Sequence, residues 1–187
     1  MAERVCPVWV GYVLASPVRK LIWENPDKIL KPYVNEGMTV ADIGCAMGFF
    51  SLPLARMVGP NGKVICVDVQ EKMIRPLEKR ARKAGLSGRI HTIICNEDSL
   101  GLDDFKGKID FALAIGVVHA VPDSARFFSE VCEAMKPAGK LLVASPRLFV
   151  PEKDFETTVS AAEQSGFTVT DTPQIKRART VLLQKNS

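Results

Sequence analysis

The strongest constraint on the fold is an alternation of short apolar runs with amphipathic segments, which repeats from residue 38 almost to residue 187. The apolar runs have the length of strands, and the segments between them have the apolar spacing of helices. Strands that are apolar along their whole length are typical of a parallel sheet covered by helices on both faces. The sequence therefore predicts an α/β fold: a single doubly wound, Rossmann-like domain with a mainly parallel, seven-stranded sheet.

The last two strands are expected to close the sheet as a pair. The predicted strands are residues 38–43, 63–69, 89–95, 109–117, 140–145, 167–172 and 179–185. The predicted helices between them are residues 49–58, 71–85, 123–136 and 154–166. Ahead of the alternation, residues 17–34 are predicted to be helical in two pieces that break before Pro26. We therefore divide the chain into an N-terminal helical arm or lid, residues 1–35, and a domain, residues 36–187.

The composition narrows the class of protein. The chain has 187 residues, of which 47% are hydrophobic, and this suits one domain with a real core. Its net charge of +4 is mild, so nucleic acid is not an expected partner. The densest basic group, Lys176, Arg177 and Arg179, is either a solvated turn or a phosphate contact.

The cysteines and the first residues of the chain indicate the cellular setting. The five cysteines form no Cys-x-x-Cys pair and no zinc-like spacing with histidine, so no metal site is predicted and a reducing cytosol suits them. Residues 5–15, VCPVWVGYVLA, are too short to span a bilayer and make a poor signal peptide. We expect this run to pack on the domain, with no stable membrane insertion and a cytoplasmic location. The sequence does not fix the oligomeric state.

The first strand leads into a glycine-containing turn, ADIGCAMG, at residues 41–48. Asp42 ends the strand, and Gly44 and Gly48 are expected to let the backbone approach a ligand closely. A dinucleotide fingerprint counted from Gly44 requires glycine at the positions that Ala46 and Phe49 occupy, so this turn does not match it. An acid followed by this turn suits a ligand that has a cationic end and no phosphate.

Two further groups stand where predicted strands end. Asp68 ends the second strand about 20 residues after the glycine turn, at the interval where an acid binds ribose hydroxyls. Asn96, Glu97, Asp98 and Ser99 follow the third strand. They either hydrogen-bond the edge of an adenine or form a turn.

These motifs together resemble the class I S-adenosylmethionine-dependent methyltransferases. VADIGCAMG matches the first motif of that family and VDVQEKMI, residues 67–74, matches the second, while residues 109–146 match the region of the fourth and fifth strands. The segment GVVHAVPD favours the small-molecule branch that includes ubiquinone/menaquinone-biosynthesis methyltransferases. The resemblance implies S-adenosylmethionine as the cofactor. The cofactor-binding residues that it implies are Asp42, Gly44, Cys45, Ala46, Gly48, Asp68, Val69, Asn96, Glu97 and Asp98.

The chain departs from the family pattern at two glycines. Ala46 replaces the central glycine of the first motif, and Ala138 replaces one glycine of the turn before the fifth strand. Because a Cβ atom is disfavoured at positive φ, we expect Ala46 to have a negative φ and cofactor binding to survive.

The expected reaction is in-line transfer of the methyl group to a small-molecule acceptor, in which the protein aligns the reactants and excludes water. His119, just beyond the fourth strand, is either a general base for the acceptor or a loop histidine bonded to the backbone. Trp9, Tyr12 and Trp23 either line the acceptor site or pack in the core. An RNA or protein methyltransferase and a non-catalytic cofactor-binding protein remain alternatives. A nicotinamide-dependent oxidoreductase is disfavoured, because the dinucleotide fingerprint is missing.

Overall fold

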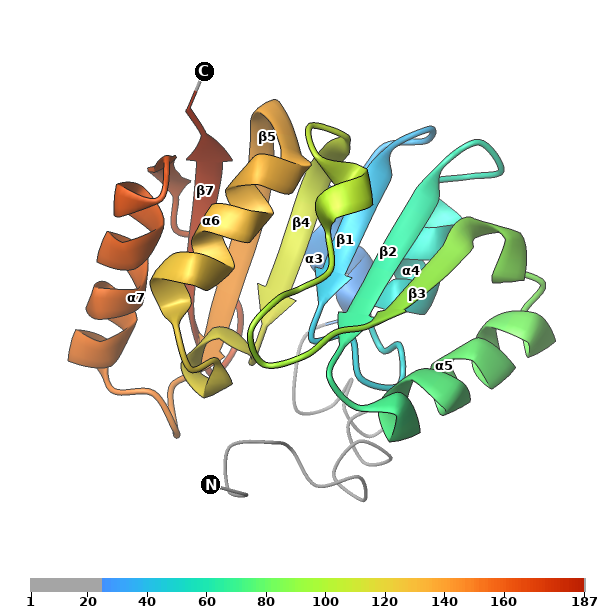
Figure 1. Cartoon of the computed structure of the whole chain (residues 1–187), viewed down its shortest axis with the longest axis horizontal. Coiled ribbons are helices and arrows are strands. Elements are labelled where there is room, and N and C mark those ends of the chain that lie inside the picture. Colours follow the sequence, from blue (N-terminus) through green and yellow to red (C-terminus); the bar gives the residue numbers. More distant parts are fainter. Residues whose placement is uncertain (1–24, 187) are drawn as a thin grey trace.

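The structure is a computed structural model, and it describes residues 25–186. It contains a seven-stranded sheet with the strand order β3-β2-β1-β4-β5-β7-β6 (Figure 1). The strands are β1 (Thr39–Ile43), β2 (Lys63–Asp68), β3 (Ile90–Ile94), β4 (Ile109–Ile115), β5 (Met135–Pro146), β6 (Phe167–Asp171) and β7 (Ala178–Lys185). The helices are α3 (Pro26–Leu30), α4 (Ser51–Met57), α5 (Glu71–Lys83), α6 (Ser124–Ala134) and α7 (Glu152–Gln164). Short 3-10 turns are η1 (Ser87–Arg89), η2 (Asp103–Phe105) and η3 (Val118–Ala120).

The pairing of the strands confirms the predicted α/β class. Strands β1 to β5 pair in parallel, while β7 is antiparallel to both β5 and β6. The strand order reverses at β1, which has β2 on one side and β4 on the other. In Figure 1 the arrowheads of β1, β2 and β4 point to the lower edge of the sheet. Ligands of open α/β sheets bind at this carboxyl edge, beside the strand where the order reverses.

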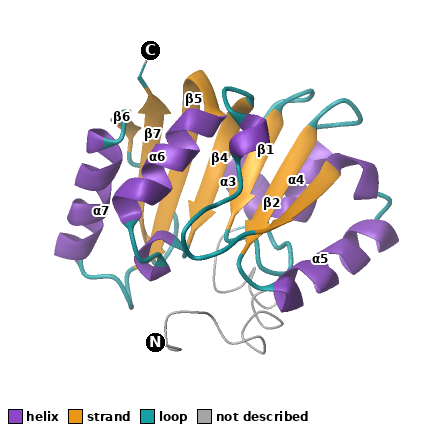
Figure 2. Cartoon of the chain, in the orientation of Figure 1, coloured by secondary structure: helices purple, strands orange, loops and turns teal. Residues whose placement is uncertain are grey.

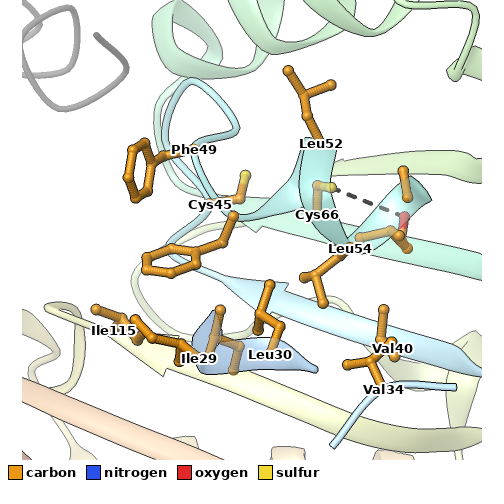
Figure 3. Packing of buried hydrophobic residues seen from close by; sticks show 14 of the residues in the cluster. Ile29, Leu30, Val34, Val40, Cys45, Phe49, Leu52, Leu54, Cys66 and Ile115 are labelled. Carbon is orange, nitrogen blue, oxygen red and sulfur yellow. Dashed lines mark hydrogen bonds between the residues drawn. The ribbon is translucent and has the colours of Figure 1, made fainter. Parts of the chain in front are cut away.

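Helices cover both faces of the sheet, because successive residues of each buried strand point to opposite faces. Val40 of β1 belongs to the core on the face of α3, α4 and α5, whereas Ala41 belongs to the core on the face of α6 and α7. Figure 2 shows α6 and α7 in front of the sheet and α3 and α4 behind it. In Figure 3, Ile29 and Leu30 of α3 lie in the same cluster as Val40 and as Leu54 of α4.

The ends of the helices follow local chemistry that can be read in the sequence. Asp123 caps α6, since its Oδ1 accepts a 3.0 Å hydrogen bond from the Arg126 N–H. α3 begins at Pro26, where the missing proline N–H costs no helical hydrogen bond, and the Asn25 side chain accepts from the Asp27 N–H. This helix agrees with the predicted break before Pro26. The rest of the predicted arm, residues 1–24, lies outside the described residues, and so do Trp9, Tyr12 and Trp23.

Several predicted boundaries were wrong by two residues or more. α3 ends at Leu30 rather than at residue 34. β4 ends at Ile115 rather than 117, because Gly116 turns the chain with a φ of 71°. η3 follows, and it contains His119. β5 begins at Met135 rather than at residue 140, and Met135 pairs with Ile109 of β4 across an irregularity in the register. The turn-like sequence KPAG is therefore part of the strand.

Candidate functional site

The ends of β1 and β2 bring the predicted acids to the same edge of the sheet. In the parallel register Asp42 of β1 pairs with Cys66 of β2, and Asp68 ends β2 two residues later. The turn after β1 is fixed on this edge, since the N–H groups of Gly44 and Cys45 both donate to the Val67 carbonyl, at 2.8 and 3.1 Å. The predicted placement of the glycine turn beside both acids is therefore what the structure shows.

Asp42 lies beneath the turn and is only 3% exposed. Its Oδ2 accepts a 2.6 Å hydrogen bond from the Ser51 hydroxyl, and Ser51, at the first position of α4, has no exposed surface. A buried carboxylate needs such donors to offset the loss of its hydration. In this structure Asp42 joins the end of β1 to the start of α4, so that the intervening turn is held from both sides.

Asp68 joins the turn to the second strand. Its Oδ2 accepts from the Ala46 N–H at 2.9 Å, and its Oδ1 accepts from the Gln70 N–H at 2.9 Å. Burial raises the pKa of the Asp68 carboxyl above its usual value of 3.8, and the backbone N–H groups counteract part of that shift. Because each carboxylate oxygen has two lone pairs, the backbone N–H groups of Ala46, Gln70 and Val69 do not fill them all, and Asp68 keeps acceptor capacity for a ligand hydroxyl.

The conformation of Ala46 differs from the prediction. Gly44, Ala46 and Gly48 all have positive φ, at 74°, 46° and 82°. The expectation of a negative φ at Ala46 was therefore wrong: the alanine adopts the left-handed conformation that glycine normally takes in this motif. The strain of the Cβ atom is of the order of 1 kcal/mol, and the hydrogen bond from Ala46 to Asp68 holds the residue in place.

The two glycines are needed for packing within the chain. A Cβ atom on Gly44 would lie 2.8 Å from the Val117 side chain, and one on Gly48 would lie 2.9 Å from Cγ of Leu77. The turn after β4 and the face of α5 thus pack against the glycine turn. The close approach of a ligand to the backbone at Gly44 and Gly48 stays a prediction.

Arg80 of α5 is a site residue that the sequence did not reveal. Its guanidinium donates to the backbone carbonyl of Met47, within the turn. Burial, together with the nearby Arg56 cation, lowers the pKa of Arg80. The spacing in the sequence could have identified Arg80 as a residue that faces the domain. Arg80 follows the buried Leu77 by three residues and therefore lies on the same side of the strongly charged helix α5.

The residues after β3 form a turn. Asn96 Oδ1 accepts from the Asp98 N–H at 2.9 Å, and Asn96 and Ser99 form an isolated antiparallel bridge. The turn is also tied to α6, because Oε2 of Glu130 accepts from the Ser99 hydroxyl at 3.1 Å and from the Leu100 N–H at 2.7 Å. Residues 96–99 thus form a turn in which the side chains of Glu97 and Asp98 are exposed, and their contact with an adenine edge stays a prediction.

Two apolar side chains beside Asp68 are unusually exposed. Val69 is 41% exposed and Ile94 is 53% exposed, and Ile94 pairs with Asp68 in the register of β2 and β3. The turn from Gly44 to Phe50 contains no basic side chain. A carboxylate with spare acceptor sites beside open apolar surface suits a sugar and a flat base. The residues present therefore fit an S-adenosyl nucleoside.

His119 lies on η3, on the other side of the glycine turn. Its side chain is exposed, and the partial loss of hydration lowers the pKa of His119 below 6.5. The contact between Val117 and the space at Gly44 brings the start of this segment against the turn. His119 is therefore a neutral imidazole at pH 7 in the segment beside the predicted cofactor site.

Cys45 is buried in the glycine turn at this edge. Burial raises the pKa of the Cys45 thiol well above its usual value, with the neighbouring Cys66 acting in the same direction, so Cys45 is protonated and inert. Within residues 25–186 no three metal-binding side chains gather in one place. A cavity of about 190 Å³ lies away from the site, between α3 and the β6–β7 loop, with Tyr33 and Gln174 in its lining.

Comparison with known proteins decides the family. Residues 34–184 match the family model described as a methyltransferase domain. The chain belongs to this methyltransferase family. Its membership confirms the resemblance read from the sequence, the enzyme class and S-adenosylmethionine as the cofactor.

The individual relatives share less than 30% sequence identity with this chain. Over 110 residues the chain is 28% identical to the ubiquinone/menaquinone biosynthesis C-methyltransferase UbiE of Pasteurella multocida. The aligned region covers 59% of this chain and 40% of that protein. The corresponding Escherichia coli protein is 27% identical over 110 residues, with 59% and 43% covered. This chain thus matches less than half the length of these curated relatives. A crystal structure of a SAM-dependent methyltransferase from Aquifex aeolicus matches with a TM-score of 0.85 at 24% identity, covering 97% of this chain and 100% of that one. At this identity the likeness establishes the shared fold.

Proposed function

We propose that the chain transfers the methyl group of S-adenosylmethionine to a small-molecule acceptor by in-line displacement. The observation that carries this proposal is the Asp68 carboxylate, which holds the glycine turn through the Ala46 N–H while it keeps acceptor sites for ribose hydroxyls. Val69 and Ile94 supply apolar surface for the base beside it.

Each residue at this edge has a distinct part in the proposal. Asp68 binds the sugar, while Asp42 and Ser51 keep the turn in the shape that receives the amino-acid end of the cofactor. The bound sulfonium supplies an electrophilic methyl group, so the protein needs mainly to orient the acceptor and exclude water. The predicted contacts of Gly44, Cys45, Ala46 and Gly48 with the cofactor would come from the backbone of the turn. Those of Asn96, Glu97 and Asp98 would come from the turn after β3.

His119 is our candidate general base. Its lowered pKa leaves the imidazole neutral at pH 7, which is the form that accepts a proton from a phenol, a thiol or an acidic carbon. Its place on η3, beyond the glycine turn from Asp68, suits a group that acts on the acceptor rather than on the nucleoside. The division into an arm or lid, residues 1–35, and a domain, residues 36–187, stays a prediction, although α3 packs in the core of the domain.

A small molecule is favoured as the acceptor over RNA or protein. The curated relatives are named for quinone biosynthesis. In the basic group predicted near the end of the chain, Arg179 is engaged in the fold, since its guanidinium donates to the Val150 carbonyl at 3.0 Å. Lys176 and Arg177 stay exposed, but two cations are fewer than a face that tracks a nucleic acid backbone carries.

The proposal is tested by methyl transfer from labelled S-adenosylmethionine into a cell extract that has been separated by size. We expect label in the low-molecular-weight fraction, and identification of the product names the acceptor. Label found only in RNA or protein would refute the small-molecule acceptor. Calorimetry with S-adenosylhomocysteine is the companion measurement, because binding without any turnover would identify a non-catalytic cofactor-binding protein.

A further inference from the structure

Two consecutive large apolar side chains project into solvent after β5. Leu148 is 85% exposed and Phe149 is 72% exposed. Among the described residues, the other exposed large hydrophobic side chains are Val69 and Ile94, at 41% and 53%, and both lie beside the cofactor site. A single exposed apolar side chain is common on protein surfaces, whereas two adjacent ones form a small contiguous apolar patch.

The exposure is fixed by the backbone and does not come from a loose loop. The N–H groups of Phe149 and Val150 both donate to the Pro146 carbonyl, at 3.1 and 3.0 Å. Val150 is buried, at 3% exposure, and anchors the far end of the loop. The turn thus holds Leu148 and Phe149 outward between two fixed residues.

Hydrogen bonds also join the loop after β5, residues 147–150, to the residues at the start of β7. The Arg147 N–H donates to the Arg177 carbonyl at 2.9 Å, and Nε of Arg147 donates to the Ala178 carbonyl at 2.9 Å. The guanidinium of Arg179 donates to the Val150 carbonyl at 3.0 Å. These three bonds bring the loop after β5 and the turn before β7 into one rigid unit.

This unit is basic around its apolar tip. Arg147, Lys176 and Arg177 are exposed on it. We call Arg147, Leu148, Phe149, Lys176 and Arg177 the basic–apolar patch. The acids nearest in the sequence are Glu152 and Asp154 in the first turn of α7 and Asp171 at the end of β6, and the exposed Lys153 stands between the first two.

We propose that the basic–apolar patch docks this protein reversibly on the surface of an anionic lipid bilayer, with Leu148 and Phe149 inserted at the level of the headgroups. Apolar side chains that enter the interface and cations that meet anionic lipids both favour such binding. A partner protein fits less well, because a stable interface buries some 20–30 residues on each side, and the apolar part of this patch is two side chains. The described residues contain no helix with the length and apolarity to cross a membrane, so the contact is a peripheral one.

The position of the patch in the fold determines which edge of the sheet would face the membrane. It follows the carboxyl end of β5, and β5 lies next to β4, whose own carboxyl end leads to His119. Figure 1 shows β4 and β1 ending at the same lower edge. A bilayer bound at the patch would therefore face the edge that carries the candidate site. The inference itself does not depend on the proposed function, because membrane binding is measured without cofactor or acceptor.

The test is flotation of the full chain with vesicles of phosphatidylcholine alone and of phosphatidylcholine mixed with phosphatidylglycerol. We expect binding to the anionic vesicles only, with at least a tenfold loss of binding in the double variant L148S/F149S. R177E reverses one charge of the patch and is expected to weaken binding by about tenfold. R82E is the matched control, since it makes the same change at an exposed residue in the last turn of α5, away from the carboxyl edge, and should bind like the unchanged chain.

Circular dichroism and thermal unfolding of L148S/F149S establish that the variant is folded, as expected for two exposed side chains. The proposal is overturned if the unchanged chain does not bind anionic vesicles. It is equally overturned if L148S/F149S or R177E binds as well as the unchanged chain, because the membrane contact then lies elsewhere. A dimer in gel filtration that dissociates in L148S/F149S would show that the patch joins two copies of the chain, and would also overturn it.

Discussion

The backbone N–H of Ala46 donates a 2.9 Å hydrogen bond to Oδ2 of Asp68, across 22 residues of sequence. The bond joins the turn after β1 to the end of β2, the two places from which this fold reaches a nucleoside. The same carboxylate is proposed to bind the ribose, so the shape of the turn and the affinity for the sugar depend on one side chain. Changes at either residue are therefore expected to affect both.

Replacing Asp68 by Asn should weaken binding of S-adenosylhomocysteine by about 10- to 100-fold, because hydrogen bonds to a charged acceptor contribute about 1.5–3 kcal/mol. Since burial raises the pKa of Asp68, the affinity of the unchanged chain should also begin to fall at a higher pH than an ordinary Asp would allow. Calorimetry across the acid range measures both effects. Glu71→Gln is the control, because Glu71 is an exposed carboxylate that pairs with Arg75. Equal affinity of D68N and E71Q would remove Asp68 from the binding site.

Replacing Ala46 by Gly should stabilise the protein by about 0.5–1 kcal/mol. The change removes the strain of a Cβ atom at positive φ, and part of that gain is lost to the greater freedom of glycine in the unfolded chain. Ala138→Gly, at a φ of 58° far from the site, should stabilise by a similar amount. Urea unfolding measures both variants. If A138G stabilises and A46G does not, the conformation assigned to Ala46 is wrong.

Replacing Ser51 by Ala should destabilise the protein by about 1.5–3 kcal/mol, because it removes a hydrogen bond to a carboxylate in a buried setting. Affinity for S-adenosylhomocysteine should fall as well, since the start of α4 then holds the turn less firmly. The control is Thr157→Ala, which removes an exposed hydroxyl bonded to the Lys153 carbonyl and should change stability little. Matching stabilities for the two variants would contradict the role given to Ser51.

His119 should make stability depend on pH near neutrality. Its pKa is lowered in the folded chain, so the unfolded chain binds the proton more tightly and the folded state loses stability as pH falls from above 6.5 through the folded pKa. Unfolding measured across this range should show a smaller loss in His119→Gln. A curve for H119Q that coincides in shape with that of the unchanged chain would show that His119 does not titrate in this way.

The same variant tests catalysis. Once the acceptor is identified, H119Q should lower kcat and leave the affinity for S-adenosylhomocysteine unchanged, because His119 is assigned to the acceptor side. The rate for the unchanged chain should persist below pH 6.5, since the lowered pKa keeps the imidazole neutral there. Undiminished turnover by H119Q would exclude the general-base role.

The sequence predicted the elements and the positions of the acids, because both depend on local patterns. Apolar runs of strand length and helical spacing located each strand and helix, and Asp42 and Asp68 were found since each ends such a run. Boundaries were missed where one residue overrides the pattern. The run IDFALAIGVV is apolar throughout, yet a positive φ at Gly116 ends β4 within it.

What the sequence could not predict are the contacts that shape the site from other elements. Arg80 reaches Met47 across 33 residues, and Val117 fills the space beside Gly44. No local pattern carries such pairings, because they depend on how α5 and the turn after β4 pack on the sheet. The positive φ at Ala46 was also missed, since the expected cost of the Cβ atom did not include the Asp68 carboxylate that holds the residue there.

β7 lies between β5 and β6 although β6 precedes it in the chain. β6 therefore has no neighbour to pair with until residues 178–185 have been synthesised and have left the ribosome. Until then the edge of β5 that β7 covers has no strand to pair with. A ribosome-stalled chain that stops before residue 178 should thus expose the unpaired edge of β5, which a chaperone or another nascent chain could bind.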